Sequence, residues 1–454
     1  MTSRTLEVCL AIGLIVSFSY VVVYVLKTRK SHRDKDEDED DEDDPKPKNF
    51  QFLSDAHCIQ FIRNSKVMFI MRGLPGSGKS TIANQIKKLY GDLAVICSAD
   101  NFRINHEGEY TWKPEEYGMP HLMCEEKARQ ACQKELPVVI IDNTNIKKRL
   151  LYWYIDTARS NGYYVVLVEP ETSWKYNISE LALKNHHQVS EEILRRMCSE
   201  FEQIIAKYYG WFPSENCART IKYRMMEAIN GCCATIPLFQ DDLQIGNESQ
   251  DDGQQENSTS SQTSSDTILL PLSCLEHIQD KLHVTSFYNK RGEALQAHNY
   301  VSSPALQDAL GSVTTLMIIA WTITPRTVTA RVKLDSKQIE LWNNHDSFAF
   351  EEGSIVASSQ RPDSSLTPLA YHDLILKPTV GKGDTAHITL SHSSDVTPVQ
   401  GRYDLRDLIR LELANSSYEE LKLPQGLARR YSDGLYAVYL NKPLFIDALF
   451  TGYY

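Results

Sequence analysis

The spacing of hydrophobic and polar residues predicts one long apolar segment followed by many short strands and helices. Val8–Leu26 has 19 residues and no charge, which is long enough to cross a bilayer as one helix. Arg4 and Glu7 precede it, whereas the nine residues after it include five basic ones. Because basic residues stay on the cytosolic side, we expect residues 1–30 to be an uncleaved, single-pass membrane anchor with the catalytic domains in the cytoplasm. A cleaved signal peptide is the alternative, although its basic start and small-residue cleavage site are missing.

Behind this segment, the apolar runs predict an α/β domain over residues 51–192 and an α+β domain over residues 193–454. In the first domain, strands are expected at Lys66–Met71, Leu93–Cys97, Pro137–Ile141 and Tyr164–Glu169, with a helix at Thr81–Tyr90. In the second domain, period-two alternation predicts strands, and two segments have helical spacing. The strands are Lys281–Tyr288, Ser312–Thr324, Val328–Leu334 and Thr385–His392, and the helices are Leu194–Trp211 and Cys217–Ile229.

Two polar segments carry more than the entire net charge of the chain, which is −11 over 454 residues. Asp34–Asp44 contributes −9, and residues 31–50 are expected to be an extended, disordered tether. Asp241–Asp266 contributes −7, and its Ser-, Thr-, Gln- and Asn-rich surroundings predict a disordered insertion over residues 240–267. The rest of the chain therefore carries +5, which is compatible with anionic ligands. Ten scattered cysteines without a CxxC pair exclude a disulfide scaffold and indicate reduced thiols.

The first domain contains a complete phosphate-binding motif. The strand at Lys66–Met71 leads into GLPGSGKS, residues 73–80, and the helix at Thr81–Tyr90 follows. This is the G-x-x-x-x-G-K-[ST] pattern in strand–loop–helix context, where backbone N–H groups surround phosphate oxygens, the lysine neutralises them and the serine holds Mg²⁺. We expect ATP or GTP with Mg²⁺ to bind at Gly73, Gly76, Ser77, Gly78, Lys79, Ser80 and Thr81.

Three charged residues at the ends of neighbouring strands complete a candidate kinase site. Asp100 and Arg103 follow the strand Leu93–Cys97, and Asp142 follows Pro137–Ile141. Carboxylates at the carboxyl ends of parallel strands lie beside the crevice where ligands bind. Asp100 is a candidate general base for a hydroxyl nucleophile, Arg103 a phosphate ligand and Asp142 an organiser of Mg²⁺. The alternative is that both aspartates only cap the helices that follow.

The second domain contains the pattern His-x-Thr on two predicted strands. Alternation places His283, Thr285 and Phe287 on one face of the first strand, and His387, Thr389 and Ser391 on one face of the second. Two imidazoles that titrate near neutral pH can supply the base and the acid that hydrolysis of a cyclic phosphodiester needs. The threonine hydroxyls can donate hydrogen bonds to the phosphoryl oxygens. We therefore expect His283 and His387 to be catalytic, Thr285 and Thr389 to bind phosphate, and no metal to be required.

These motifs carry a resemblance to known families. The first domain resembles the polynucleotide-kinase-like branch of P-loop proteins, in which a late loop supplies arginines that close over ATP. The corresponding loop here, Leu183–Gln188, has no arginine, which favours nucleotide binding over kinase turnover. The whole chain from Phe61 to Tyr454 resembles the 2′,3′-cyclic-nucleotide 3′-phosphodiesterase family. The shared segments are RGLPGSGKST (Arg72–Thr81), SAD (Ser98–Asp100), VVLVEP (Val165–Pro170), YYGWF (Tyr208–Phe212), AHITLS (Ala386–Ser391) and FTGYY (Phe450–Tyr454).

The resemblance implies a two-lobed 2H phosphoesterase domain that opens nucleoside or RNA-terminal 2′,3′-cyclic phosphates to 2′-phosphates. It implies that the two histidine–threonine pairs act in a cleft between the lobes, with Tyr208 nearby. Family members commonly have an arginine two residues before the second histidine, where this chain has Thr385. They also commonly end in a prenylated cysteine box, whereas this sequence ends at Tyr454 and has Val8–Leu26 as its expected anchor.

Two other functions fit the sequence. The first is a bifunctional RNA-end enzyme with a 5′-hydroxyl kinase that depends on Lys79 and Asp100. The second is a membrane tether or scaffold that binds RNA or the cytoskeleton through its two domains.

Overall fold

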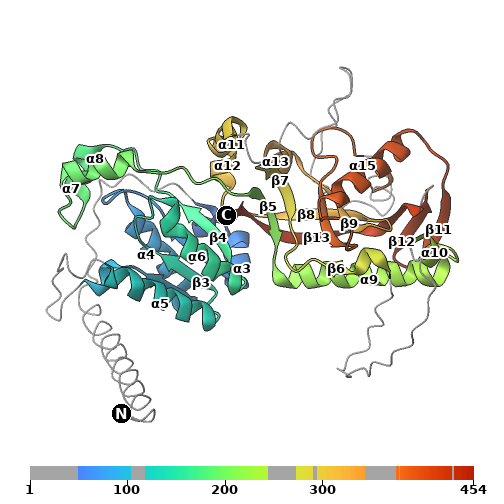
Figure 1. The fold of residues 1–454 in the computed structure, drawn as a ribbon, viewed down its shortest axis with the longest axis horizontal. Coiled ribbons are helices and arrows are strands. Elements are labelled where there is room, and N and C mark those ends of the chain that lie inside the picture. Colours follow the sequence, from blue (N-terminus) through green and yellow to red (C-terminus); the bar gives the residue numbers. More distant parts are fainter. Residues whose placement is uncertain are drawn as a thin grey trace, which may run out of the picture. The chain divides into compact units, whose positions relative to one another are not determined.

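The structure is a computed structural model that describes residues 50–103, 118–243, 272–289, 294–342, 375–377, 379–431 and 434–454. Figure 1 shows its course from the α/β part to the antiparallel part. The expected anchor Val8–Leu26 and the expected tether up to residue 49 lie outside these residues. Within the described ranges, no helix is both long and apolar enough to cross a membrane. Residues Pro47–Tyr454 form one compact unit.

A parallel four-stranded sheet forms the first part of this unit, in the order β2-β3-β1-β4. Every residue of β1 and β3 is buried, as expected for a parallel sheet with both faces covered by helices. Phe69 packs into one hydrophobic core and Ile70 into another, so alternate side chains of β1 point to opposite faces of the sheet. The four strands predicted in this domain are confirmed within two residues at each end: β1 Val67–Met71, β2 Ala94–Cys97, β3 Val138–Ile141 and β4 Tyr164–Val168.

Helices cover both faces of this sheet. The helix predicted at Thr81–Tyr90 is confirmed and begins two residues earlier. The described α-helices of this part are α2 Gln51–Ser54, α3 Ala56–Arg63, α4 Lys79–Tyr90, α5 Met119–Gln133, α6 Lys148–Ser160, α7 Ile178–Lys184 and α8 Glu191–Ser199. Leu181 of α7 and Leu194 of α8 pack with Leu74 of the phosphate-binding loop, so these two helices lie next to that loop.

A nine-stranded sheet with antiparallel pairing forms the second part of the described chain. Its order is β11-β12-β13-β5-β7-β10-β9-β8, and β13 also pairs with β8, so the sheet returns on itself. The predicted class, a parallel-sheet domain followed by an antiparallel-sheet domain, is therefore confirmed. The strands are β5 Tyr208–Pro213, β6 His277–Ile278, β7 Val284–Tyr288, β8 Val313–Ile323, β9 Thr327–Lys333, β10 His387–His392, β11 Glu419–Leu423, β12 Gly426–Arg430 and β13 Tyr436–Tyr453.

Helices of the second part lie along this sheet. They are α9 Glu215–Thr235, α10 Phe239–Leu243, α11 Ala294–Val301, α12 Pro304–Ala309, α13 Ser336–Glu340 and α15 Gln400–Leu413. The helix predicted at Cys217–Ile229 is confirmed within α9. Residues 240–243, expected in the disordered insertion, belong instead to α10, where Asp242 accepts hydrogen bonds from Arg430 at 2.7 and 3.0 Å. Residues 244–267 of that insertion lie outside the described residues.

Two further predictions are wrong in detail. The helix expected over Leu194–Trp211 ends at Ser199, and Tyr208–Pro213 is a strand because it pairs with β13 on one side and β7 on the other. This tertiary pairing outweighs the local helical spacing. A bulge between β5 and β7 shifts the register after Thr285, so Phe287 joins Val284 in the hydrophobic core and does not share the face of Thr285.

The last strand links the two sheets. Thr451 of β13 donates a 2.6 Å hydrogen bond to the carbonyl of Val165 in β4, and Tyr164 donates one of 2.6 Å to the carbonyl of Pro213. Val313 and Leu449 pack into the same core as Phe69.

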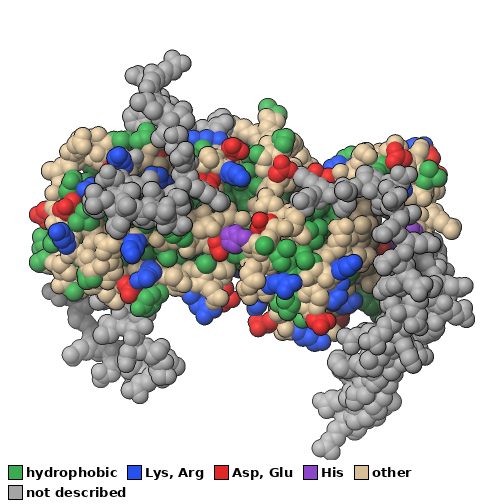
Figure 2. Space-filling model, turned by 180° about the vertical axis from the view of Figure 1, so that it is seen from behind, with side chains coloured by type: hydrophobic (Ala, Val, Ile, Leu, Met, Phe, Trp, Pro, Cys, Tyr) green, Lys and Arg blue, Asp and Glu red, His purple; other side chains and the backbone are tan. Residues whose placement is uncertain are grey.

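On the face seen in Figure 2, basic and acidic side chains stand side by side, so no single sign of charge dominates the described surface of that view.

Candidate active site

The phosphate-binding loop connects β1 to α4. Gly76 and Gly78 have φ values of +79° and +99°, which favour glycine. A Cβ on Gly76 would stand 2.6 Å from the carbonyl oxygen of Leu181 in α7, so a larger residue would displace that helix. The first backbone N–H groups of α4 have no partner within the helix, as at any helix start, and are suited to bind an anion there. The structure thus gives the predicted motif its expected loop-to-helix form.

Lys79 and Ser77 are both buried inside this loop. The Lys79 ammonium donates a 2.8 Å hydrogen bond to the carbonyl of Leu74. Burial lowers the pKa of Lys79 to about 8, while the charges of Asp142 and Asp100 act to raise it. The Ser77 hydroxyl is buried and has no hydrogen-bond partner among the described residues. A buried cation and an unused hydroxyl at a helix start fit a phosphate ligand.

The predicted carboxylates converge on the same site. Ser80 hydrogen-bonds to Asp142, and burial raises the pKa of Asp142 although this bond and Lys79 act to lower it. Asp100 lies 3.6 Å from Arg103 and 3.4 Å from Nε2 of His187. The structure thus brings together the loop residues, including Thr81 at the start of α4, and the three candidate kinase residues. His187 is exposed, and nothing in its local sequence pointed to its contact with Asp100.

The late loop contributes no arginine to this site, and the nearby Arg72 is bound to other groups. The loop Leu183–Gln188 contains none. Arg72, just before the motif, is buried and forms an ion pair with Glu169. Its guanidinium also donates to the carbonyls of Asn145 and Glu202 at 3.0 and 2.7 Å. Arg72 therefore anchors the start of the loop and is not available to a γ-phosphate.

The two His-x-Thr elements meet where β7 and β10 pair. The only paired positions of these strands in the described chain are Val284 and Ile388, the central residues of the two elements. Neighbouring positions of an antiparallel pair lie opposite each other, so His283 comes beside Thr389, and His387 beside Thr285. The positive charge of His283 acts on His387, which agrees with this proximity. Both imidazoles thus lie on the face opposite Val284 and Ile388, which are buried in the hydrophobic core.

Both imidazoles are held in the same way. Nδ1 of His283 lies 3.3 Å from the carbonyl oxygen of Lys281, and Nδ1 of His387 lies 2.7 Å from that of Thr385. A carbonyl oxygen can only accept, so Nδ1 carries the hydrogen in both rings and Nε2 is left for substrate or water. The backbone at position 385, rather than its side chain, thus orients the second histidine.

Burial lowers the pKa of both histidines. For His283, burial is opposed by the hydrogen bond to Lys281. For His387, burial, together with the charges of Arg402 and His283, lowers the pKa to about 4, although the hydrogen bond to Thr385 and the charge of Asp404 act to raise it. His387 is therefore neutral at pH 7, as a general base has to be.

Aromatic rings line the His283 side of the cleft. Tyr208 stacks on His283 with ring centroids 4.6 Å apart, and Phe212 stacks on it at 5.6 Å. Tyr453 in turn stacks on Tyr208, with ring centroids 4.8 Å apart, and the two residues pair across β13 and β5. The predicted residue Tyr208 thus lies against a catalytic candidate. Phe212 and Tyr453 were not singled out, although both belong to the segments YYGWF and FTGYY.

The threonines differ in their surroundings. Thr285 is half-buried on β7. The Thr389 hydroxyl donates a 3.0 Å hydrogen bond to the carbonyl of Pro398, just before α15. A Cβ on Gly401 would meet Oγ1 of Thr389 at 3.0 Å and Cγ2 of Thr329 at 2.5 Å. The start of α15 therefore lies directly on the His387 side of the cleft, and only glycine fits at position 401.

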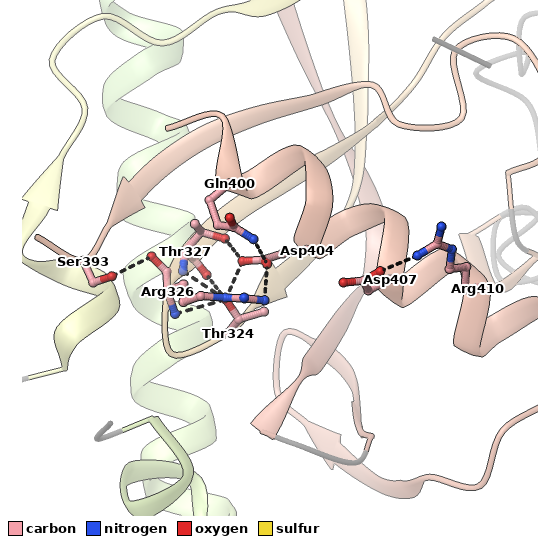
Figure 3. A network of polar contacts seen from close by, with 8 residues as sticks. All are labelled: Thr324, Arg326, Thr327, Ser393, Gln400, Asp404, Asp407 and Arg410. Carbon is pink, nitrogen blue, oxygen red and sulfur yellow. Dashed lines mark hydrogen bonds and ion pairs between the residues drawn. The ribbon is translucent and has the colours of Figure 1, made fainter. Parts of the chain in front are cut away.

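A buried carboxylate fixes this helix. Asp404 is fully buried and accepts hydrogen bonds from Thr324 at 2.8 Å, Thr327 at 2.6 Å and Gln400 at 2.9 Å. Arg326 forms an ion pair with it at 2.7 Å, and Figure 3 shows these groups converging on Asp404. Asp404 thus ties the first turn of α15 to the β8–β9 hairpin.

Arg402 lies on the turn of α15 that Asp404 fixes, and the sequence did not identify it. Its charge lowers the pKa of both His387 and Asp384, which places its guanidinium near the second histidine. Arg331, which pairs with His387 in the β9–β10 register, is buried in an ion pair with Glu412 at 2.8 Å. Of these two arginines, Arg402 is the one whose charge lowers the pKa of His387. Nothing in its local sequence marks it, because its position depends on the packing of α15.

This fold joins a P-loop domain to an antiparallel domain in which the two His-x-Thr elements meet. Comparisons with known proteins agree. The family model described as 2',3'-cyclic nucleotide 3'-phosphodiesterase (CNP or CNPase) matches residues 205–454, more than half of the chain, and that of an AAA domain matches residues 68–204. The chain therefore belongs to the 2′,3′-cyclic nucleotide 3′-phosphodiesterase family and is a hydrolase of the phosphodiesterase class.

Individual relatives cover most of the chain. The 2',3'-cyclic-nucleotide 3'-phosphodiesterase of Mus musculus is 27% identical over 407 residues, 89% of this chain and 87% of the mouse protein. That of Pongo abelii is 28% identical over the same shares. A solved structure of the Pnkp1/Rnl/Hen1 RNA repair complex matches with a TM-score of 0.25 and 19% identity, covering 30% of this chain and 44% of that chain.

Proposed function

We propose that the antiparallel domain hydrolyses 2′,3′-cyclic phosphates to 2′-phosphates by acid–base catalysis between His283 and His387. The observation that carries this is the meeting of the two His-x-Thr elements at Val284 and Ile388, with both Nδ1 atoms bound to backbone carbonyls. The Nε2 atoms of both imidazoles are then available to the same substrate molecule. The test is to identify the product that the full chain forms from 2′,3′-cyclic AMP in the presence of EDTA. We expect 2′-AMP, and 3′-AMP would contradict the proposal.

In this mechanism His387 is the base and His283 the acid. Neutral His387 takes a proton from water, whose oxygen attacks phosphorus, and protonated His283 gives its proton to the 3′-oxygen as the bond between phosphorus and that oxygen breaks. Burial and the nearby Arg402 charge favour neutral His387. Thr285 and the Arg402 guanidinium would stabilise the phosphoryl oxygens as their charge increases. The predicted phosphate ligand Thr389 would first have to release its hydrogen bond to the carbonyl of Pro398, because a hydroxyl has only one hydrogen to donate. The adjacent Tyr208 would hold the His283 ring in place by stacking.

We also propose that the P-loop domain binds ATP or GTP with Mg²⁺. Lys79 and the N–H groups at the start of α4 would hold the phosphates, and Ser80 with Asp142 would hold Mg²⁺. Bound Mg²⁺ would neutralise phosphate charge. The proposal does not extend to phosphoryl transfer, because the loop Leu183–Gln188 supplies no arginine and Arg72 is committed to Glu169.

Replacing the buried lysine of this loop is expected to weaken nucleotide binding. Lys79→Met removes the only charge of the motif GLPGSGKS, and a charge-assisted hydrogen bond contributes about 1.5–3 kcal/mol, or about 10–150-fold in Kd. Calorimetric titration with ATP and Mg²⁺ measures the change. The matched control is Lys88→Met, an exposed lysine of the same helix, which should bind as the natural chain does. Equal binding by Lys79→Met would contradict the proposal.

We further propose that Val8–Leu26 anchors the protein in a membrane with its domains in the cytoplasm, on the basis of the charge-free sequence and its basic flank. After alkaline carbonate extraction, the full chain should remain in the membrane pellet and be digested by protease added from the cytosolic side. Deleting residues 8–26 should release it, whereas deleting the acidic residues 34–44 should not. Release of the full chain would contradict the anchor.

A further inference from the structure

The segment that includes α7 packs directly on the phosphate-binding loop. A Cβ on Gly76 would stand 3.0 Å from the backbone nitrogen of Asn185 and 3.2 Å from the carbonyl carbon of Lys184. Trp174 donates a 3.1 Å hydrogen bond from Nε1 to the carbonyl of Gly76, and the Lys184 ammonium lies over the Trp174 ring at 4.2 Å. This segment therefore covers the loop whose buried Ser77 hydroxyl has no hydrogen-bond partner among the described residues.

The residues after Asn185 form a closed turn. The buried Asn185 side chain donates a 3.0 Å hydrogen bond to the carbonyl of Leu181 and accepts one of 2.6 Å from the backbone N–H of Val189. Gln188 has a φ of +53°, in the left-handed region that residues other than glycine adopt uncommonly. Because these contacts hold both ends of the turn, they set the position of His187 between them.

His187 reaches the carboxylates of the nucleotide site. Its Nε2 lies 3.4 Å from Oδ2 of Asp100. Burial raises the pKa of Asp142, and the charges of Lys79 and His187 are among the effects that oppose it. The charge of Asp100 acts on both Asp142 and Lys79. The imidazole of His187 therefore belongs to the same cluster as the lysine of the phosphate-binding loop.

The charged groups of this cluster balance one another before a nucleotide binds. Lys79 and Arg103 supply positive charge, and Asp100 and Asp142 supply negative charge. Burial lowers the pKa of His121 on α5, which also lies within reach of the charges of Arg103 and Asp100. A nucleoside triphosphate remains negative even with one Mg²⁺ bound, so its arrival favours the protonated form of a neighbouring histidine.

A protonated imidazole has the donors that this position needs. It carries N–H groups at both ring nitrogens, whereas the neutral ring carries only one. Nε2 of His187 can then pair with Asp100 while Nδ1 donates to a phosphate oxygen. Asp100 is the candidate base for a nucleophile that would attack the terminal phosphate, so its contact with His187 places the imidazole at that end of the nucleotide.

We propose that His187 binds the terminal phosphate of a nucleoside triphosphate, as a cation held between that phosphate and Asp100. This rests on the proposed nucleotide-binding function of the P-loop domain and specifies which nucleotide the site prefers. The loop Leu183–Gln188, which lacks arginine, thus contributes a positive charge that depends on pH. The site prefers ATP to ADP, and the preference is largest at low pH.

The test is calorimetric titration of the full chain with ATP and with ADP, each with Mg²⁺, at about pH 5.5 and about pH 8.5, on either side of the range in which histidines usually titrate. At the lower pH, His187→Gln should weaken ATP binding about three- to tenfold, as for one partly exposed charged contact, and leave ADP binding unchanged. The effect should be smaller at the higher pH. Because each variant is compared with the natural chain at the same pH, protonation of the nucleotide itself cancels.

The matched control is His186→Gln, an exposed histidine of the same loop, which should bind both nucleotides as the natural chain does. Binding of neither nucleotide by the natural chain would overturn the proposed nucleotide site itself. Binding of both, with His187→Gln affecting neither or both equally, would overturn only the role of His187. A loss confined to ATP but equal at the two pH values would overturn the protonated ring. A loss confined to ATP and largest at low pH supports the inference, and His187→Arg should then keep the preference for ATP at both pH values.

Discussion

Replacing either cleft histidine with alanine is expected to lower kcat for 2′,3′-cyclic AMP by about 10²–10⁴-fold. Each imidazole is assigned one of the two proton transfers, and no other histidine in the described chain shares the His-x-Thr arrangement. His392, whose ring lies tilted against that of His277 with centroids 5.1 Å apart, is the matched control, and His392→Ala should retain activity. Steady-state kinetics on folded variants measures the change. Full activity in both His283→Ala and His387→Ala would contradict the mechanism.

A modified substrate distinguishes the two roles. Sulfur in place of the bridging 3′-oxygen leaves as a thiolate and needs no proton from an acid. His283→Ala should therefore recover most of its lost rate with this substrate, whereas His387→Ala should not, because water still needs a base. Recovery in His387→Ala alone would reverse the assignment.

Removing the Arg402 guanidinium is expected to lower kcat/KM about 10–150-fold, the equivalent of one charge-assisted hydrogen bond of about 1.5–3 kcal/mol. Arg402 stands two residues before Asp404 in α15, and its charge lowers the pKa of His387. Arg402→Lys should retain part of the activity because the charge remains. Arg410→Ala, on the same helix beside Asp407 and apart from the Asp404 network, should have no effect.

The pH profile separates this role from loss of structure. A base is active only when unprotonated, so kcat/KM falls below the pKa of His387, which is about 4 in the natural chain. Arg402 lowers that pKa, so Arg402→Ala should raise it and move the acid limb to higher pH. The pKa of the acid His283 is also lowered, so kcat/KM should begin to fall with rising pH before the pH reaches the ordinary pKa of a histidine. An Arg402→Ala profile that is lower but not displaced would contradict the electrostatic role.

Much of the fold could be predicted because local patterns determine it. The buried strand before GLPGSGKS and the three other parallel strands were placed within two residues, and both His-x-Thr strands form. The helix expected at Leu194–Trp211 failed where Tyr208–Pro213 becomes a strand, because its two partners β7 and β13 are distant in sequence. The displacement of Phe287 has the same cause, since a bulge depends on the partner strand.

The candidate site divides in the same way. Residues within a motif could be predicted: the loop that holds Lys79, and the histidines that β7 and β10 bring together. Residues that reach the site through packing could not. Arg402 depends on the seating of α15 by Asp404, and Tyr453 on the pairing of β13 with β5. The resemblance also drew attention to Thr385, which stands where family members commonly have an arginine. In the structure the carbonyl of Thr385 orients His387, and the charge of a different arginine, Arg402, acts on that histidine.

The measurement that tests the central claim most directly is product analysis after turnover of 2′,3′-cyclic AMP by the full chain in ¹⁸O-labelled water with EDTA present. The mechanism predicts 2′-AMP with one ¹⁸O in its phosphate, formed by the natural chain and lost in His387→Ala. Formation of 3′-AMP, a product without label, or undiminished turnover in His387→Ala would contradict hydrolysis by the two histidines.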